Sequence, residues 1–203
     1  MTMSALHLPP LTSRSAPSSV PVDNRLAYVF FAVAYVFGHG LNALAVGGAT
    51  LIPSWLAWVM LGLGFAAGTV ASTVSAMRAQ HALSGPQLTT ARMLGTAWIT
   101  GFTGLFFVIT GLALSTGDAD LQLLLWPTGS ALVVGLIYIA EGAVRRDRLH
   151  YALGTLLAVL GGVALMLPPF ATLTVMAAGG GGAYIFATLL AHQRRRAVSS
   201  SAQ

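Results

Sequence analysis

The sequence contains no cysteine and no lysine, and only 7% of its 203 residues are charged. The absence of cysteine excludes disulfides, cysteine-ligated metal ions, iron–sulfur clusters and covalently attached haem. A soluble domain has roughly 25% charged residues. The low charge, together with 56% hydrophobic residues and a mean hydropathy of +0.78, therefore indicates that most of the chain lies in lipid. This length leaves no room for a second folded domain.

Motifs for chemistry inside a membrane are also missing. There is no HExxH zinc motif, no pair of aspartates within one apolar segment and no acid-rich motif that binds a metal–diphosphate. Gly129 and Ser130 lack the spacing of an intramembrane serine protease motif. General acid–base or metal-assisted chemistry needs more buried acids or bases than the apolar segments supply. We therefore expect no enzyme activity, no cofactor and no bound metal ion.

Six apolar segments are long enough to cross a bilayer, which takes about 20 residues. They cover residues 26–46, 51–77, 93–115, 121–144, 149–167 and 170–191. All ten basic residues are arginines, and they lie before the first segment, after the last one, or in the loops after the second and fourth. Because cytoplasmic loops are enriched in arginine, we expect a multi-pass inner-membrane protein with both termini cytoplasmic. Arginines at span ends do not form a nucleic-acid patch, so no nucleic acid is expected.

The expected fold is all-α, a polytopic membrane protein with six transmembrane helices arranged as three helical hairpins. Each hairpin begins beside an arginine, at Arg25, Arg92 or Arg148. The bundle is expected over residues 25–193, between a disordered cytoplasmic tail of residues 1–24, rich in Ser, Pro and Thr, and a second cytoplasmic tail of residues 194–203. The expected partners are the lipid bilayer, with anionic lipid at the arginine clusters, and either further copies of the chain or another membrane protein.

Polar side chains follow one face of the first span. At helical spacing, this face carries Tyr28, Tyr35, His39 and Asn42. A buried imidazole or amide in lipid needs a partner, because an unsatisfied polar group there costs several kcal/mol. Two interpretations stay open. The face forms an intramembrane polar site with His39 as its hydrogen-bonding or titratable member, or its polar groups bond to other spans and only fix packing.

Two further sets of side chains are candidates for the same site. Thr100 and Thr103 share a face of the third span, where they either line a polar site or bond back to carbonyls of their own helix. Glu141 is the only acid inside any span, and it follows Tyr138 by three residues. It forms either an interfacial ion pair with Arg145, four residues on, or an inward-facing carboxylate that carries a proton or binds a substrate.

Small residues mark two places for close helix contact. In the second span, small residues recur every four positions, at Gly64, Gly68, Ser72 and Ala76. A ridge of this kind lets helix backbones approach closely in lipid. The last span contains four consecutive glycines, residues 179–182, where we expect either a very close helix contact or a local bend.

The second half of the chain resembles a known group of proteins. Its run LLWPTGSALVVGLIYIAEGAVRRDRLHYALGTLLAVLGG, followed by MAAGGGG, lies within residues 124–182. It is similar to a group of small actinobacterial integral membrane proteins without an assigned activity. The three-hairpin plan is also similar to a bacterial six-helix membrane protein family linked to acid resistance. Neither resemblance implies catalytic residues.

Two functions are compatible with these patterns. The first is a non-enzymatic membrane component, accessory, structural or stress-related, that acts through helix contacts; the small-residue ridges and the scarcity of buried charge indicate it. The alternative is a small-molecule or ion transporter or channel with an intramembrane polar site. That alternative depends on Glu141, the threonine face of the third span and the polar stripe of the first span, which carries Tyr35, His39 and Asn42.

Overall fold

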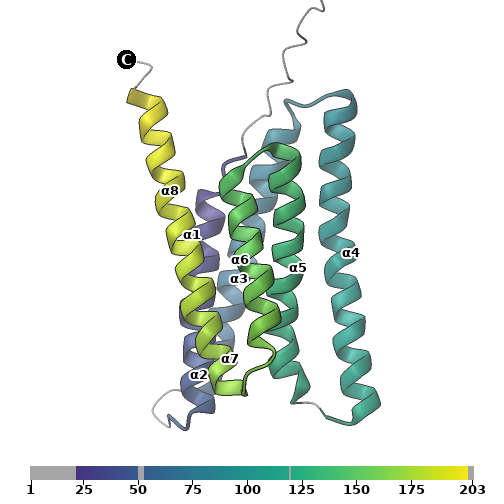
Figure 1. Ribbon diagram of the computed structural model, residues 1–203, viewed down its shortest axis with the longest axis vertical. Helices are drawn as coiled ribbons and strands as arrows, with labels where there is room; N and C mark the ends of the chain where they lie inside the picture. Colours follow the sequence, from purple (N-terminus) through teal and green to yellow (C-terminus); the bar gives the residue numbers. More distant parts are fainter. Residues whose placement is uncertain (1–21, 50–52, 119, 201–203) are drawn as a thin grey trace, which may run out of the picture.

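The computed structural model describes residues 22–49, 53–118 and 120–200, which form six helical rods (Figure 1). The first rod runs without a break through α1 (Arg25–Val33), a π-helical turn η1 (Ala34–His39) and α2 (Gly40–Val46). Four single helices follow: α3 (Ser54–Gln80), α4 (Gly85–Thr116), α5 (Leu121–Arg145) and α6 (Arg148–Ala164). The last rod joins α7 (Pro169–Val175), a second π-helical turn η2 (Met176–Gly180) and α8 (Gly181–Ser200). The predicted disorder of residues 1–21 and the predicted start of the second span at Leu51 lie outside the described residues.

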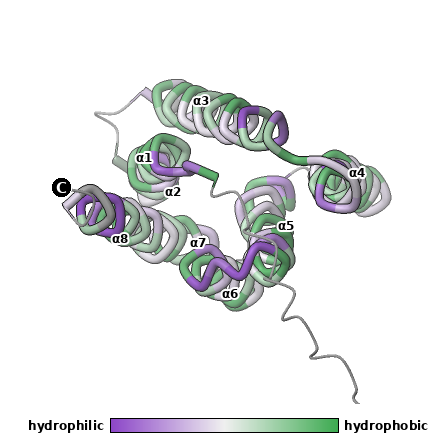
Figure 2. Tube along the Cα trace, turned by 90° about the horizontal axis from the view of Figure 1, so that it is seen from above, coloured by the Kyte–Doolittle hydropathy of each residue, from purple (hydrophilic) through white to green (hydrophobic). Residues whose placement is uncertain are grey.

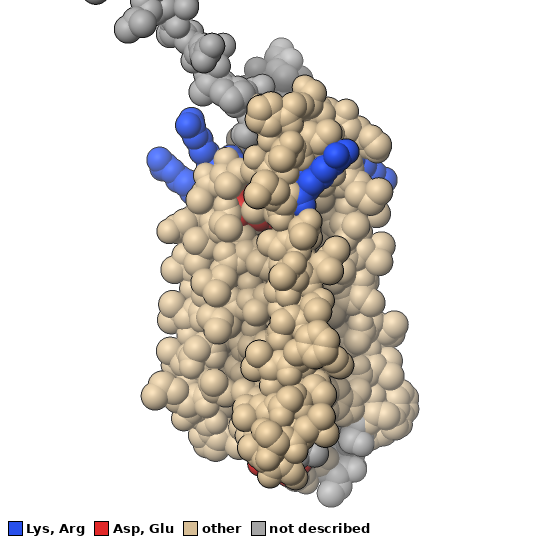
Figure 3. All heavy atoms as spheres, turned by 90° about the vertical axis from the view of Figure 1, so that its right-hand side faces the viewer, with Lys and Arg blue, Asp and Glu red and all other residues tan. Residues whose placement is uncertain are grey.

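The predicted all-helical, apolar character is confirmed. Five of the rods are long and apolar enough to cross a membrane, and the sixth, α6, has 17 residues. Figure 3 shows arginine side chains near one end of the molecule and an uncharged surface over the middle of the face drawn. We call this end, where α1 begins and α8 finishes, the arginine end, and the opposite one the far end (Figure 1).

Two helices are longer than the sequence pattern predicts. The loop expected over residues 77–92 is a turn of residues 81–84, because α4 begins at Gly85 and not near Met93. Pro86 suits the first turn of a helix, where its missing N–H would have no partner in any case. α8 likewise continues to Ser200, past the predicted end of the last span at residue 191. The hydrophobic pattern predicts only where a segment leaves the apolar part of the membrane. The helix itself can continue beyond that point until it meets a residue that ends it.

The six rods form an open arc when viewed along the bundle (Figure 2). The rod α1–α2 lies between α3 and the rod α7–α8, then come α6 and α5, and α4 lies at the end against α5. The predicted arrangement of three separate hairpins is not confirmed. The closest pair, α5 and α6, joins the fourth and fifth spans, which the prediction assigned to different hairpins.

Glycines explain why α5 and α6 are so close. Gly135 on α5 faces Gly154 on α6, while Gly142 on α5 lies against the backbone of Tyr151 and Gly161 on α6 lies against the backbone of Thr128; all four glycines are buried. A Cβ added at Gly154 would lie 2.7 Å from the carbonyl oxygen of Gly135 and 2.7 Å from the backbone nitrogen of Ile139. The two backbones therefore touch directly, as small residues allow in lipid.

The ridge predicted on the second span also makes a close contact. A Cβ at Gly64 would lie 2.7 Å from the Cβ of Ala34, and Gly68 faces the ring of Phe31. α3 therefore packs its glycine face on the first rod.

Two neighbouring glycines of α6 give a matched test of this packing. A Cβ at Gly161 would lie 2.8 Å from the backbone nitrogen of Leu132, whereas a Cβ at Gly162 has nothing within 4 Å. We expect Gly161→Ala to lower the free energy of unfolding by about 1–3 kcal/mol through overpacking. Gly162→Ala is the control and should be neutral or stabilising, because alanine favours helix. Denaturant unfolding in detergent measures both, and equal effects would show that α5 and α6 are not in backbone contact.

Candidate functional site

The predicted polar residues fall into two separate groups inside the bundle. Tyr138 and Glu141 lie toward the arginine end of α5, while Tyr35, His39 and Asn42 lie farther along the first rod, toward the far end. All five are buried. The single polar site expected from the sequence is therefore two sites at different depths.

The first group, the Glu141 cluster, contains the following side chains from four rods: Tyr28, Trp98, Tyr138, Glu141, Arg145 and His150. Glu141 is 8% exposed and His150 is 2% exposed. The indole nitrogen of Trp98 donates to Glu141 Oε1 over 2.9 Å, and His150 Nε2 lies 3.2 Å from Glu141 Oε2. Arg145 is more distant, with its guanidinium nitrogen 3.8 Å from Glu141 Oε2. Glu141 is therefore an inward-facing carboxylate, and the ion pair with Arg145 is its longest contact.

The cluster continues from Glu141 through His150 to the first rod. The Tyr28 hydroxyl lies 2.7 Å from His150 Nδ1. An imidazole whose Nε2–H donates to the carboxylate has Nδ1 free to accept from the phenol. The ring of Tyr138 covers that of His150, with centroids 4.0 Å apart. A phenol, an imidazole and a carboxylate thus form one hydrogen-bonded row, in which each nitrogen of His150 has a partner.

The short turn between α5 and α6 positions this row. Arg146 adopts a left-handed backbone conformation with φ 56°, which ends α5. Asp147 then caps α6 by accepting from the backbone nitrogens of Leu149 and His150. His150 is therefore held in the first turn of α6. The glycine contacts between α5 and α6 bring this turn close enough for the imidazole to reach Glu141.

The second group opens onto a cavity, which we call the His39 pocket. Its volume is about 230 Å³, and its lining includes His39, Asn42, Trp58, Phe65, Trp126 and Ser130. His39 is 2% exposed, and neither ring nitrogen has a hydrogen-bond partner among the described residues. Its ring packs edge-on against Tyr35, with centroids 5.0 Å apart. The Asn42 amide donates to the Gly38 carbonyl over 2.9 Å and so is held by its own helix.

Two π-helical turns lie beside each other in the middle of the bundle, and one of them carries part of the second group. η1 carries Tyr35 and His39, and it contacts η2, which carries the first two of the four consecutive glycines. The ring of Tyr35 packs directly on Gly180, where any Cβ would collide with it. Of the two alternatives expected at the glycines, the very close helix contact is therefore present, and it coincides with the π-helical turn η2. Single π-helical turns occur frequently at functional sites.

Aromatic rings connect the Glu141 cluster to the His39 pocket. The Tyr28 ring lies 6.1 Å from that of Tyr184, and Tyr184 lies 5.4 Å from Tyr35, measured between centroids. Tyr35 in turn contacts His39. The interior between the two polar groups is therefore filled by tyrosines and not by aliphatic side chains alone.

The threonine face of the third span does not reach either group. Thr100 and Thr103 are exposed on α4. α4 packs against α5 at the end of the arc, apart from the first rod that carries His39 (Figure 2). Nearby Thr96 donates to the carbonyl of Arg92, four residues back, in the local bonding typical of threonine in helices.

Three members of the Glu141 cluster were not predicted as site residues: Tyr28, Trp98 and His150. Tyr28 does share the polar face of the first span, so its spacing was an available indication. No sequence pattern connects Trp98 or His150 to the other site residues, because the sequence alone does not reveal which spans meet. His150 is the second residue of the predicted fifth span, yet it is as buried as His39.

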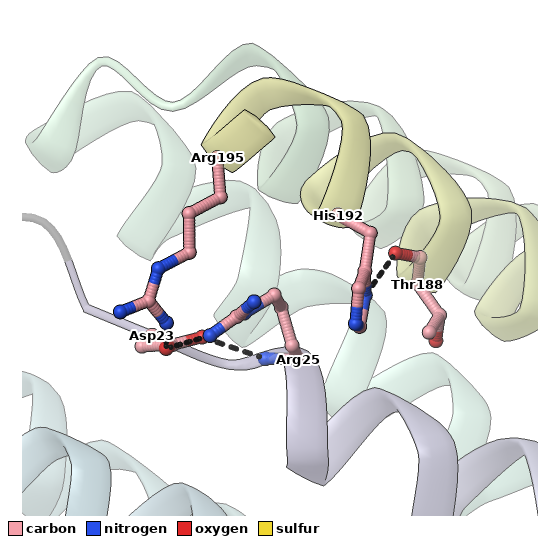
Figure 4. Close-up of polar contacts among 5 residues, drawn as sticks. All are labelled: Asp23, Arg25, Thr188, His192 and Arg195. Atoms are coloured by element: carbon pink, nitrogen blue, oxygen red, sulfur yellow. Dashed lines mark hydrogen bonds and ion pairs between the residues drawn. The ribbon is translucent and has the colours of Figure 1, made fainter. Parts of the chain in front are cut away.

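A third polar region is an open groove at the arginine end (Figure 4). It has a volume of about 590 Å³ and lies between α1, α3 and α8, with Arg25, Arg78 and His192 in its lining. Asp23 accepts from Arg25 over 2.7 Å and from Arg195 over 3.1 Å, which ties the start of α1 to α8. His192 contacts the Thr188 carbonyl of its own helix at 3.2 Å.

Comparisons with protein-family models, curated protein sequences and solved structures find no match to this chain. The resemblance based on residues 124–182 therefore stays a prediction. Within the described ranges, no three His, Asp or Glu side chains come together as metal ligands would. Function has to be argued from the two buried groups themselves.

The Tyr28 hydroxyl provides a test of the Glu141 cluster. We expect Tyr28→Phe to lower the free energy of unfolding by about 1 kcal/mol, because it removes the partner of a buried histidine nitrogen. Tyr151→Phe is the matched control, since Tyr151 directly follows His150 but is exposed. Unfolding by denaturant in detergent measures both variants. Equal stability of the two would mean that the Tyr28–His150 contact contributes nothing.

Proposed function

We propose that this chain is a non-enzymatic transport protein of the cytoplasmic membrane, in which the Glu141 cluster takes up and releases protons. The observation that supports this most directly is the row Tyr28–His150–Glu141, in which a carboxylate, an imidazole and a phenol are hydrogen-bonded and buried. Ionisable groups inside a membrane protein are costly and commonly mark proton or substrate pathways. A bundle that needed only packing contacts has no use for a carboxylate at this depth.

The chemistry of the row suits proton transfer. A histidine can take a proton at one ring nitrogen and release another from the second. In this row, Nδ1 faces the Tyr28 hydroxyl and Nε2 faces Glu141, so both nitrogens have an exchange partner. Tyr184 and Tyr35 carry further phenol groups toward His39 and the far end. These groups are the candidates for continuing the pathway through the membrane.

We propose that the arginine end faces the cytoplasm and that all six rods cross the membrane. Loops rich in arginine stay on the cytoplasmic side. The groove lined by Arg25 and Arg78 at this end would then contact anionic lipid headgroups, which attract arginine by about 1 kcal/mol per charge. The far end, with Asp118 and Asp120, would face outward.

The alternative function is an accessory component that acts through helix contacts, and α4 is the observation that favours it. α4 packs against α5 at the end of the arc, and large apolar side chains cover its outer surface, including Ile99, Phe107 and Leu114. An outer helix of this kind suits lateral contact with another membrane protein or a second copy of the chain. Native mass spectrometry after gentle extraction tests this role, and the consistent absence of a stoichiometric partner would count against it.

Proton handling predicts a flux that depends on Glu141. In proteoliposomes with a pH-sensitive dye inside and an imposed potassium diffusion potential, we expect the wild-type chain to accelerate proton movement. Glu141→Gln should reduce that movement to the level of empty vesicles, because an amide does not exchange the proton. Asp120→Asn, at the exposed opposite end, is the control and should retain wild-type flux.

Two results would contradict the proton-handling role. One is wild-type flux in a folded Glu141→Gln variant, which would show that the cluster contributes only to packing. The other is the absence of flux above empty vesicles for the wild-type chain under every gradient tested.

Orientation can be measured with single cysteines, because the chain has none of its own. We expect Ala82→Cys, in the turn between α3 and α4, to be protected from a membrane-impermeant maleimide in intact cells. Asp118→Cys, in the turn between α4 and α5, should be labelled under the same conditions. Both should react after the cells are opened. The reverse pattern would invert the proposed orientation.

A further inference from the structure

His39 is a buried polar group that the folded chain leaves unsatisfied. Neither ring nitrogen has a hydrogen-bond partner among the described residues, although the side chain is 2% exposed. A buried polar group without a partner costs several kcal/mol in lipid. Native proteins rarely retain such a group unless it has a role or an additional partner. The residue borders the His39 pocket, so a molecule in that pocket lies beside the imidazole and would reach its buried ring nitrogens after a small side-chain movement.

The lining of the pocket defines what kind of molecule fits. The lining contains no Arg, Asp or Glu. A charged ligand would therefore lose its hydration without meeting an opposite charge in the pocket. Trp58, Phe65 and Trp126 supply aromatic surface for an apolar body. Polar atoms besides those of His39 come from Asn42, Gln122 and Ser130. The balance is that of a typical small-molecule site, mostly apolar with a few polar groups that fix orientation.

Size and position restrict the ligand further. Drug-sized ligands occupy pockets of about 300–1,000 Å³, whereas this one has about 230 Å³. Trp58 and Gln122 lie near the first turns of α3 and α5, at the far end, and Trp58 is 54% exposed. The mouth of the pocket is therefore close to the membrane surface at that end, where amphipathic molecules concentrate.

We propose that the His39 pocket binds a small neutral molecule with a compact apolar body and one hydroxyl or carbonyl group, which hydrogen-bonds to the His39 ring. A neutral imidazole offers one donor and one acceptor, so it can bond either group. The apolar body packs against Trp58, Phe65 and Trp126. This site is distinct from the Glu141 cluster, and its existence does not depend on proton handling.

Three ring compounds that differ in one group test the chemistry: cyclohexanol, methylcyclohexane and cyclohexanecarboxylate. None absorbs where tryptophan is excited, so emission from Trp58 and Trp126 reports binding to protein in lipid nanodiscs. Nitrogen NMR of ¹⁵N-histidine-labelled protein reports the His39 ring directly, with its signals assigned by their loss in His39→Phe. All measurements use one lipid concentration, so that partitioning of each probe into lipid is the same for every variant.

Two variants and one control isolate the site. His39→Phe keeps an aromatic ring beside Tyr35 but removes both nitrogens. Ser130→Leu fills the cavity while leaving His39 unchanged, so it also covers the case in which His39→Phe fails to fold. His81→Phe is the control, because His81 is exposed in the turn between α3 and α4.

The expected result is saturable binding of cyclohexanol that shifts the His39 nitrogen signals. Methylcyclohexane should bind about tenfold more weakly, the worth of one hydrogen bond, and the carboxylate should not bind. His39→Phe should weaken cyclohexanol binding by a similar factor, Ser130→Leu should abolish it, and His81→Phe should change nothing.

Three results would overturn the assignment. The first is that no probe gives a saturable response, as expected if the cavity holds only water. The second is that methylcyclohexane binds as tightly as cyclohexanol. The third is that Ser130→Leu leaves cyclohexanol binding unchanged. Because no proton flux is measured, failure here leaves the Glu141 result standing, and the reverse also holds.

Discussion

Backbone contact between α5 and α6 decides where the buried charge of this protein lies. Glycines on both helices let the two backbones touch, and a sharp turn capped by Asp147 starts α6 beside the end of α5. This geometry holds His150 opposite Glu141 and turns the carboxylate away from lipid. In a membrane, a carboxylate has to be satisfied by protein because water is absent from the hydrocarbon. Tyr28 and Trp98 then complete the cluster from two other rods.

A second close contact shapes the middle of the bundle. The ring of Tyr35 lies on Gly180, and both residues belong to π-helical turns. An extra residue in a helical turn rotates the side chains that follow, so η1 changes the direction in which His39 points relative to a regular helix. His39 borders a cavity near the far end and not the Glu141 cluster, because it lies eleven residues beyond Tyr28 along the same rod. The polar face of the first rod thus contributes to both groups, with Tyr28 in the Glu141 cluster and His39 in the pocket.

The two groups differ in how completely they are satisfied, and this difference separates their roles. In the Glu141 cluster, the described contacts account for both nitrogens of His150 and both oxygens of Glu141. An arrangement of this kind has all its described polar atoms paired within the chain, so it needs no ligand to complete it. His39 lacks a partner in the described chain and lies beside free volume, which suits reversible binding of a ligand. The two proposed roles, proton handling and ligand binding, therefore concern different parts of the interior.

The sequence by itself determined the all-helical, apolar character that suits a membrane protein, the approximate positions of the helices and the burial of the polar face of the first span. These features follow from composition and periodicity, which depend on which side of each segment is in contact with lipid and which side with protein. It did not determine that Trp98 and His150 meet Glu141, that Thr100 and Thr103 face outward, or that the predicted site divides in two. Periodicity defines a face within one helix, but it contains no information on how that face is rotated or which helix it meets. Glycine contacts, a capped turn and two π-helical turns set those rotations, and only the tertiary structure contains them.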